Sequence, residues 1–134
     1  MTGQRPFCRI AAGVALAVAA LVPGVAAATP AQPSTITLTV TENQQPRSVV
    51  LQCDPTGGNH PQAAAACAEL HAVDGNFQAL DRVRPQGKSG GCTKDNRQVK
   101  ASAVGEWRGR QISHQYSVSN PCMLHQRTGV VFEF

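Results

Sequence analysis

The chain has 134 residues, and its 12 lysines and arginines against 8 aspartates and glutamates give a formal net charge of +4. The basic residues are scattered along the sequence, which argues against nucleic acid as a partner because nucleic-acid-binding proteins gather positive charge on one face. The length fits one small domain, and a small domain gains stability from crosslinks.

The N-terminus has the parts of a secretory signal. Arg5 and Arg9 precede the apolar run Ile10–Val22, and small residues follow it. This apolar run is too short to span a bilayer comfortably. We therefore expect a signal peptide at residues 1–28 and a secreted, extracellular domain at residues 29–134, with no membrane association after signal removal. Loss of the two arginines lowers the formal net charge from +4 to +2.

Cysteine usage predicts two disulfides. Cys8 leaves with the signal, and the rest of the chain then enters an oxidising compartment. The four remaining cysteines are Cys53, Cys67, Cys92 and Cys122. They allow three pairings, among which the sequence alone does not choose, and we favour the sequential one. Zinc held by the first two of these cysteines with His60 and His71 is conceivable, but export favours a bridge, so we expect no metal and no cofactor.

The first half of the domain predicts a hairpin and then a helix. Residues 34–41 alternate between apolar side chains and threonines, as a half-buried strand does. The same period over residues 49–53 predicts a second strand, paired antiparallel with the first through a connection at residues 42–46. An alanine-rich helix is expected over residues 62–72.

The second half predicts a helical turn at residues 76–80, a loop at residues 82–91 that contains Pro85 and three glycines, and a hairpin over residues 98–119. Trp107 in this hairpin is expected in the core or at a dimer interface. A fifth strand is expected over residues 129–134. The predicted class is α+β, a five-stranded antiparallel sheet with one main and one short helix.

One lysine stands beside a crosslink. The run Cys92-Thr93-Lys94-Asp95-Asn96 follows a glycine-rich stretch, so Lys94 is expected to be exposed two residues beyond a disulfide. A protease-binding loop needs such a side chain and such an anchor. Arg84 and Lys88 lack a neighbouring cysteine and are expected to be plain cleavage sites. We infer a secreted serine-protease inhibitor.

Catalysis by the chain itself is not expected. The four histidines are His60, His71, His114 and His125. None of them stands in a recognisable nucleophile motif such as Gly-x-Ser-x-Gly.

The chain resembles the Streptomyces subtilisin inhibitor family over nearly its whole secreted part. The resemblance rests on Leu38-Thr39-Val40, Val50-Leu51-Gln52-Cys53, Gly58-Asn59-His60-Pro61, Ala66-Cys67-Ala68-Glu69-Leu70, Gly105-Glu106-Trp107-Arg108-Gly109, Ser119-Asn120-Pro121-Cys122 and Val131-Phe132-Glu133-Phe134. It implies a five-stranded antiparallel sheet with two helices, bridges joining Cys53 to Cys67 and Cys92 to Cys122, and a sheet-to-sheet homodimer.

The resemblance also implies a reactive bond between Lys94 and Asp95. Lys94 is then the P1 residue, whose side chain enters the protease's specificity pocket, and lysine suits trypsin-like enzymes, whose pocket ends in an aspartate. Subtilisin-like enzymes are a second target class. The family usually has proline at the position of Thr93, and an apolar residue followed by tyrosine at those of Asp95 and Asn96. Loss of that proline is expected to loosen the loop and to weaken binding.

The residues near this bond leave further choices. Asp95 is expected to repel or attract charges of the protease, or to pair with Arg97 internally. Asn120 is expected to be a turn residue, with hydrogen bonding to the back of the loop as a second hypothesis. Two other functions remain open. One is a secreted binding protein, or transglutaminase substrate, that keeps the fold without inhibition, and the other is an inhibitor of a secreted metalloprotease.

Overall fold

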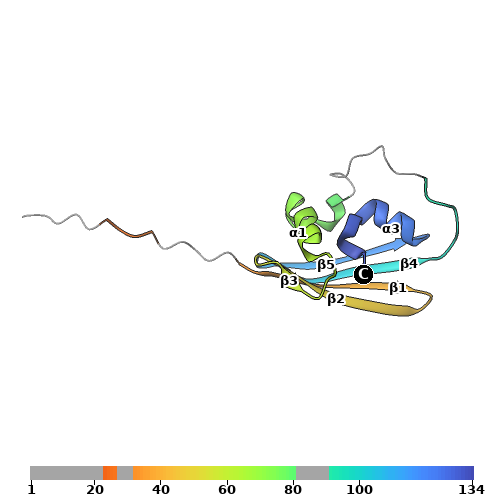
Figure 1. Ribbon diagram of the computed structural model, residues 1–134, viewed down its shortest axis with the longest axis horizontal. Coiled ribbons are helices and arrows are strands. Elements are labelled where there is room, and N and C mark those ends of the chain that lie inside the picture. The colour runs from red at the N-terminus through yellow and green to blue at the C-terminus, as the bar shows by residue number, and fades with distance from the viewer. Residues whose placement is uncertain (1–22, 27–31, 81–90) are drawn as a thin grey trace, which may run out of the picture.

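A computed structural model describes residues 23–26, 32–80 and 91–134. Its centre is one antiparallel sheet of five strands in the order β3-β2-β1-β4-β5 (Figure 1). The strands are β1 (Ser34–Glu42), β2 (Gln45–Cys53), β3 (Gly57–Gly58), β4 (Val99–Trp107) and β5 (Arg110–Val118). The helices are α1 (Ala63–Ala72), α3 (Pro121–Thr128) and the 3-10 turns η1 (Phe77–Ala79) and η2 (Gly129–Phe132). The predicted α+β class is confirmed. The apolar run of the predicted signal lies outside the described residues, as do Arg84 and Lys88.

The central strand β1 follows the predicted alternation. Ile36, Leu38 and Val40 are each at most 2% exposed, whereas Thr35 and Thr37 face solvent. β1 pairs with β2 on one side and β4 on the other, so its buried face forms the middle of the core. The β1–β2 connection is shorter than predicted. Asn43 and Gln44 take positive φ values of 49° and 62°, as a two-residue hairpin turn requires, and β2 therefore begins at Gln45.

Helix α1 packs on the same face of the sheet. It buries Ala66, Cys67 and Leu70, and Cys67 is bonded to Cys53 of β2 with Cα atoms 5.7 Å apart. The preferred pairing is therefore confirmed for this bridge. The zinc alternative is wrong, because both of its cysteines are in the disulfide. The predicted helical turn after α1 is η1.

The last residues do not form the predicted strand. Residues 121–128 form α3, with Pro121 in its first turn, and η2 follows it directly. Val131 and Phe132 are adjacent in sequence and are both at most 5% exposed, a burial pattern that a strand with alternating faces cannot produce. They pack on the core face as a turn, and the fifth strand of the sheet is the two-residue β3.

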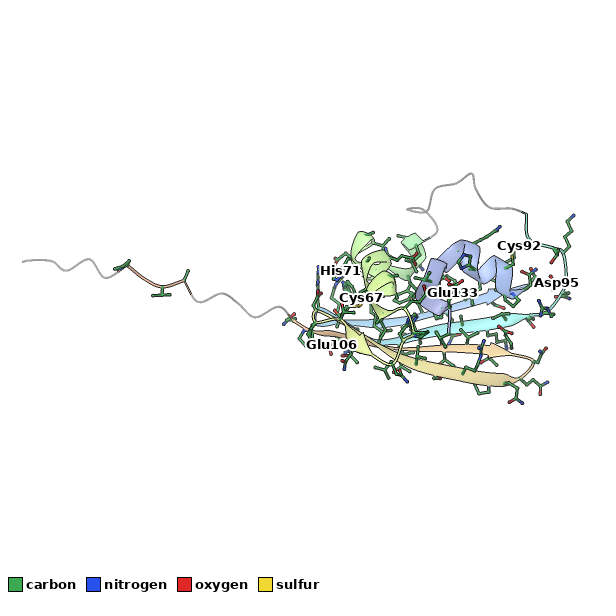
Figure 2. All side chains as sticks on the ribbon, viewed as in Figure 1. Cys67, His71, Cys92, Asp95, Glu106 and Glu133 are labelled. Carbon is green, nitrogen blue, oxygen red and sulfur yellow. A yellow bond between two sulfur atoms is a disulfide. The ribbon has the colours of Figure 1, made fainter. Side chains whose placement is uncertain are left out.

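Trp107 lies in the core and is fully buried. Its Nε1–H donates to Asp74 Oδ1 at 3.0 Å, and this bond is the first cause of the lowered pKa of the Asp74 carboxyl. Arg110 and Arg108 also bind this carboxylate. This cluster lies at the end of the sheet that carries His71 and Glu106, far from Asp95 (Figure 2).

Candidate functional site

We call residues 91–98 the reactive segment because they contain the predicted reactive bond. They lead into β4 without forming a helix or a strand. It curves along the edge of the molecule at the end where Asp95 lies (Figure 2). Thr93, Lys94, Asn96 and Arg97 are exposed, and Asp95 is partly buried. A segment without helix or strand hydrogen bonding needs other groups to hold it in one conformation.

A disulfide provides the first anchor. Cys92 is bonded to Cys122, and their Cα atoms are 5.7 Å apart. Cys122 is the second residue of α3, so the acyl side of the predicted reactive bond is tied to the start of a packed helix. The second predicted bridge is therefore confirmed.

Asn120 provides the second anchor. Its side-chain amide donates to the backbone carbonyl of Thr93 at 2.9 Å and to that of Asp95 at 3.1 Å. Its Oδ1 accepts from the Met123 N–H at 2.9 Å and so caps α3. Asn120 is 2% exposed, so its own side chain is shielded from bulk water. The second hypothesis for this residue, that it binds the back of the loop, is confirmed.

The Asp95 carboxylate binds within the segment. Oδ1 accepts from the Thr93 hydroxyl at 2.9 Å, and Oδ2 accepts from Arg97 Nε at 2.8 Å. The bond from Arg97, and after it the bond from Thr93, lowers the pKa of the Asp95 carboxyl below 3.8. Of the alternatives considered for Asp95, the structure therefore shows the internal ion pair with Arg97. We expected Thr93, in place of proline, to loosen the segment. That expectation did not take into account the hydrogen bond from the Thr93 hydroxyl to Asp95.

Lys94 is exposed and has no hydrogen bond or ion pair with any described residue. Its backbone neighbours on both sides, Thr93 and Asp95, are the residues whose carbonyls Asn120 holds. The segment therefore presents a free basic side chain from a peptide that is fixed at both flanks.

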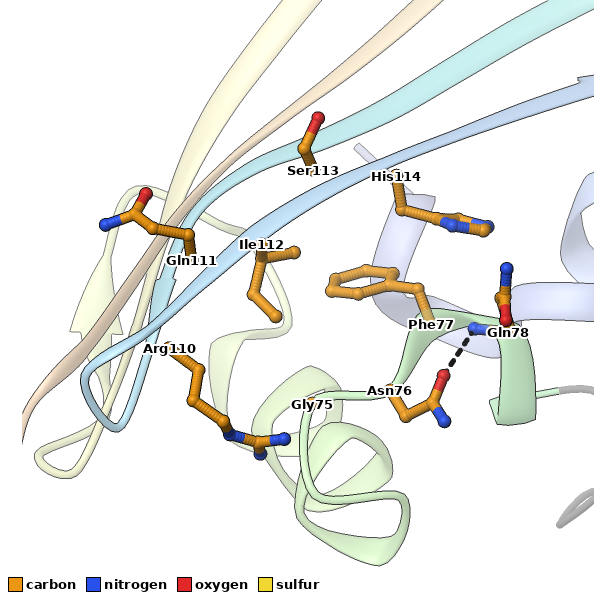
Figure 3. Close-up of a pocket in the computed structure, with 9 residues that line it drawn as sticks. All are labelled: Gly75, Asn76, Phe77, Gln78, Arg110, Gln111, Ile112, Ser113 and His114. Carbon is orange, nitrogen blue, oxygen red and sulfur yellow. Dashed lines mark hydrogen bonds between the residues drawn. The ribbon is translucent and has the colours of Figure 1, made fainter.

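A cavity of about 300 Å³ lies elsewhere, between η1 and the first half of β5 (Figure 3). It is lined by Gly75, Asn76, Phe77, Gln78, Arg110, Gln111, Ile112, Ser113 and His114. The rings of Phe77 and His114 stack with centroids 6.2 Å apart, and burial lowers the pKa of His114. None of the lining residues belongs to the reactive segment.

No group of three or more histidine, cysteine or acidic side chains suited to a metal occurs among the described residues. Within residues 23–26, 32–80 and 91–134, no helix is long and apolar enough to cross a membrane.

Known proteins match this chain in sequence and in structure. A sequence profile of the subtilisin inhibitor-like family matches residues 32–120. The protease inhibitor SIL-V1/SIL-V4 of Streptomyces netropsis is 42% identical over 114 residues, covering 76% of this chain and 96% of that protein. The transglutaminase-activating metalloprotease inhibitor of Streptomyces mobaraensis is 36% identical over 110 residues, covering 76% and 72%. Sermetstatin of Streptomyces caespitosus, solved in complex with Bacillus licheniformis subtilisin, matches with a TM-score of 0.62 at 27% identity, covering 76% of this chain and 99% of that one.

Replacing Asn120 with alanine should release the reactive segment. The variant loses the hydrogen bonds to the Thr93 and Asp95 carbonyls and the N-terminal cap of α3. The cap alone stabilises the helix by about 1 kcal/mol. We expect trypsin to cleave after Lys94 at least about tenfold faster than in the wild type. Each lost hydrogen bond contributes about 1 kcal/mol to the stability of the held conformation of the segment. Asn76→Ala is the matched control, because Asn76 caps η1 through its side chain. Equal cleavage rates in the two variants would contradict the role of Asn120.

The pKa of Asp95, measured by titration, should report the hydrogen bond from Arg97. The pKa of this carboxyl is lowered in the folded chain, so the ionised carboxylate stabilises the folded segment. This stabilisation is fully present above pH 3.8 and is lost as the pH falls through the folded pKa. NMR of the carboxyl carbon should give a midpoint below 3.8 that rises in Arg97→Ala and stays unchanged in Arg110→Ala. A wild-type midpoint at or above 3.8 would refute the assignment.

Proposed function

The chain belongs to the subtilisin inhibitor-like family, and on that premise we propose that it is a secreted inhibitor that enters serine proteases as a substrate does, with Lys94 as P1. The observation that carries this proposal is the exposed Lys94 between flanks held by Cys122 and Asn120. Secretion is supported by the signal-like N-terminus and by the two disulfides, which persist in oxidising compartments.

The anchors suggest how binding replaces turnover. The protease serine attacks the Lys94 carbonyl carbon, and the bond to the Asp95 nitrogen breaks as the protease histidine supplies a proton. In an ordinary substrate the amine then diffuses away. Here the Asp95 carbonyl is bonded to Asn120, and the Cys92 side is bonded to the same helix, so the amine stays beside the acyl carbon. The acyl-enzyme can then reclose before water reaches it.

Trypsin-like enzymes are the first proposed targets. Their specificity pocket ends in an aspartate, and the Lys94 ammonium would find a charge partner there out of bulk water. Subtilisin-like enzymes are the second target class. The match to sermetstatin, which was solved bound to a subtilisin, supports that choice.

A homodimer formed through the sheet is a further part of the proposal. Figure 1 shows α1 and α3 on one face of the sheet, and no described element covers the opposite face. On that uncovered face Val104 is 54% exposed, so one apolar side chain is available for a contact between two sheets.

Inhibition of a metalloprotease is a second candidate, because the Streptomyces mobaraensis relative is named as a metalloprotease inhibitor. It predicts that a secreted metalloprotease loses activity on addition of this protein, and that the Lys94→Ala variant inhibits it equally well. Undiminished metalloprotease activity at a large excess of inhibitor would rule this function out.

Replacing Lys94 with alanine should weaken inhibition of trypsin by at least about 30-fold, because truncating one partner of a buried charge pair costs about 2–5 kcal/mol. The inhibition constants of wild type and variant measure this. Lys100→Ala is the control, since Lys100 is an exposed lysine in β4, outside the reactive segment. Trypsin inhibition that is unchanged in Lys94→Ala would remove Lys94 from the P1 position.

A further inference from the structure

The Asp95 carboxylate receives hydrogen bonds from both sides of the proposed reactive bond. The Thr93 hydroxyl reaches it from the acyl side at 2.9 Å, and Arg97 Nε reaches it from the leaving-group side at 2.8 Å. Because both bonds end on the one Asp95 carboxylate, the three side chains meet on the same side of the segment. We call this set of Thr93, Asp95 and Arg97 the carboxylate clamp.

Resting on the proposed function, we propose that the Asp95 carboxylate is a positioning group that holds the two sides of the reactive bond together during acylation. When the peptide bond between Lys94 and Asp95 breaks, Thr93 stays with the acyl group. Asp95 and Arg97 stay with the departing amine. A hydrogen bond from Thr93 to Asp95 therefore spans the break. It keeps the Asp95 nitrogen within reach of the Lys94 carbonyl carbon.

The reaction that the clamp biases is a reversible acyl transfer. In the forward step the serine oxygen of the protease bonds to the Lys94 carbonyl carbon, the carbon–nitrogen bond to Asp95 breaks, and the serine proton passes through the protease histidine to the new amine. In the reverse step the amine attacks the same carbon and returns the proton. Hydrolysis needs water in the place of that amine, so a retained amine favours resynthesis.

The clamp also gives a physical account of two departures from the usual family residues. Proline before Lys94 would stiffen the backbone, and an apolar residue after Lys94 would carry no charge. In this chain the two replacements, Thr93 and Asp95, bond to each other. A proline ring would restrict the backbone through its fixed φ. Here the hydrogen bond from Thr93 to Asp95, which crosses the reactive bond, restricts the segment instead.

The clamp is distinct from the Asn120 anchor. Asn120 holds backbone carbonyls from the buried side, whereas the clamp joins side chains that are exposed or half exposed. Arg97 and Asp95 are 63% and 40% exposed, and exposed ion pairs contribute little to the stability of a fold. Variants of the clamp should therefore fold normally, so that a change in reactivity reports positioning.

The test measures the equilibrium between intact inhibitor and inhibitor cut at the reactive bond. Trypsin is added to intact protein and, separately, to cut protein whose parts the Cys92–Cys122 disulfide still joins. Mass analysis then counts cutting and resynthesis only between Lys94 and Asp95. We expect Thr93→Val and Arg97→Ala each to raise the ratio of cut to intact protein, and the cutting rate, about tenfold at unchanged melting temperature.

Two comparisons make the test specific. Arg110→Ala removes an arginine that contacts an exposed aspartate at 2.8 Å, the same distance as in the clamp but at the other end of the sheet, and it should leave the ratio unchanged. In an Asp95→Ala background, Thr93→Val and Arg97→Ala should have no further effect, because both act through the missing carboxylate.

Each outcome decides the proposal separately from the proposed function. Unchanged ratios in Thr93→Val and Arg97→Ala, or full effects in the Asp95→Ala background, overturn the clamp even if the wild type inhibits trypsin. Raised ratios support the clamp even if the wild type proves to be a weak inhibitor. If trypsin neither cuts nor reseals the bond between Lys94 and Asp95, the clamp and the proposed function both fall.

Discussion

The first turn of α3 is the constraint on which the reactive segment depends. Asn120 and Cys122 both hold the segment from this turn, one through two hydrogen bonds and the other through a disulfide. Because the Asn120 amide is buried, departure of the segment would leave its N–H groups without partners, at a cost of about 1–3 kcal/mol. The order of the segment and the order of the helix start are therefore coupled. A peptide without secondary structure of its own is held in this way.

The position of α3 depends in turn on the sheet. Leu124 is buried under the helix, and the Thr128 hydroxyl donates to its carbonyl at 2.8 Å. The η2 turn that follows places Phe132 against Tyr116 of β5, with ring centroids 5.7 Å apart. The Tyr116 hydroxyl donates to the Phe77 carbonyl, which joins η1 to the same strand. Burial of apolar side chains on one sheet face thus fixes the helix whose start holds the reactive segment.

Much of this arrangement is visible in the sequence, and the missing parts have physical reasons. The alternation around Leu38 predicted β1 because one face of that strand is buried and the other is wet. Helix α3 is not predicted by the sequence, which indicates only a turn at Asn120. Asn120-Pro121 can begin a turn or a helix, and α3 buries only two side chains, Leu124 and Thr128, which leaves a weak helical period. The terminal apolar run was read as a strand because its composition suits one, but Val131 and Phe132 are buried side by side. The bonds from Asn120 to Thr93 and Asp95 join residues 25 or more positions apart, which no local pattern reveals.

The central claim is that Lys94 is offered to a protease from a segment that survives the encounter. Its most direct test is titration of trypsin with the oxidised protein, with residual activity followed and the recovered inhibitor sequenced. The account predicts stoichiometric loss of trypsin activity, with any slow cleavage confined to the bond between Lys94 and Asp95. Full trypsin activity together with rapid degradation of the protein would contradict it.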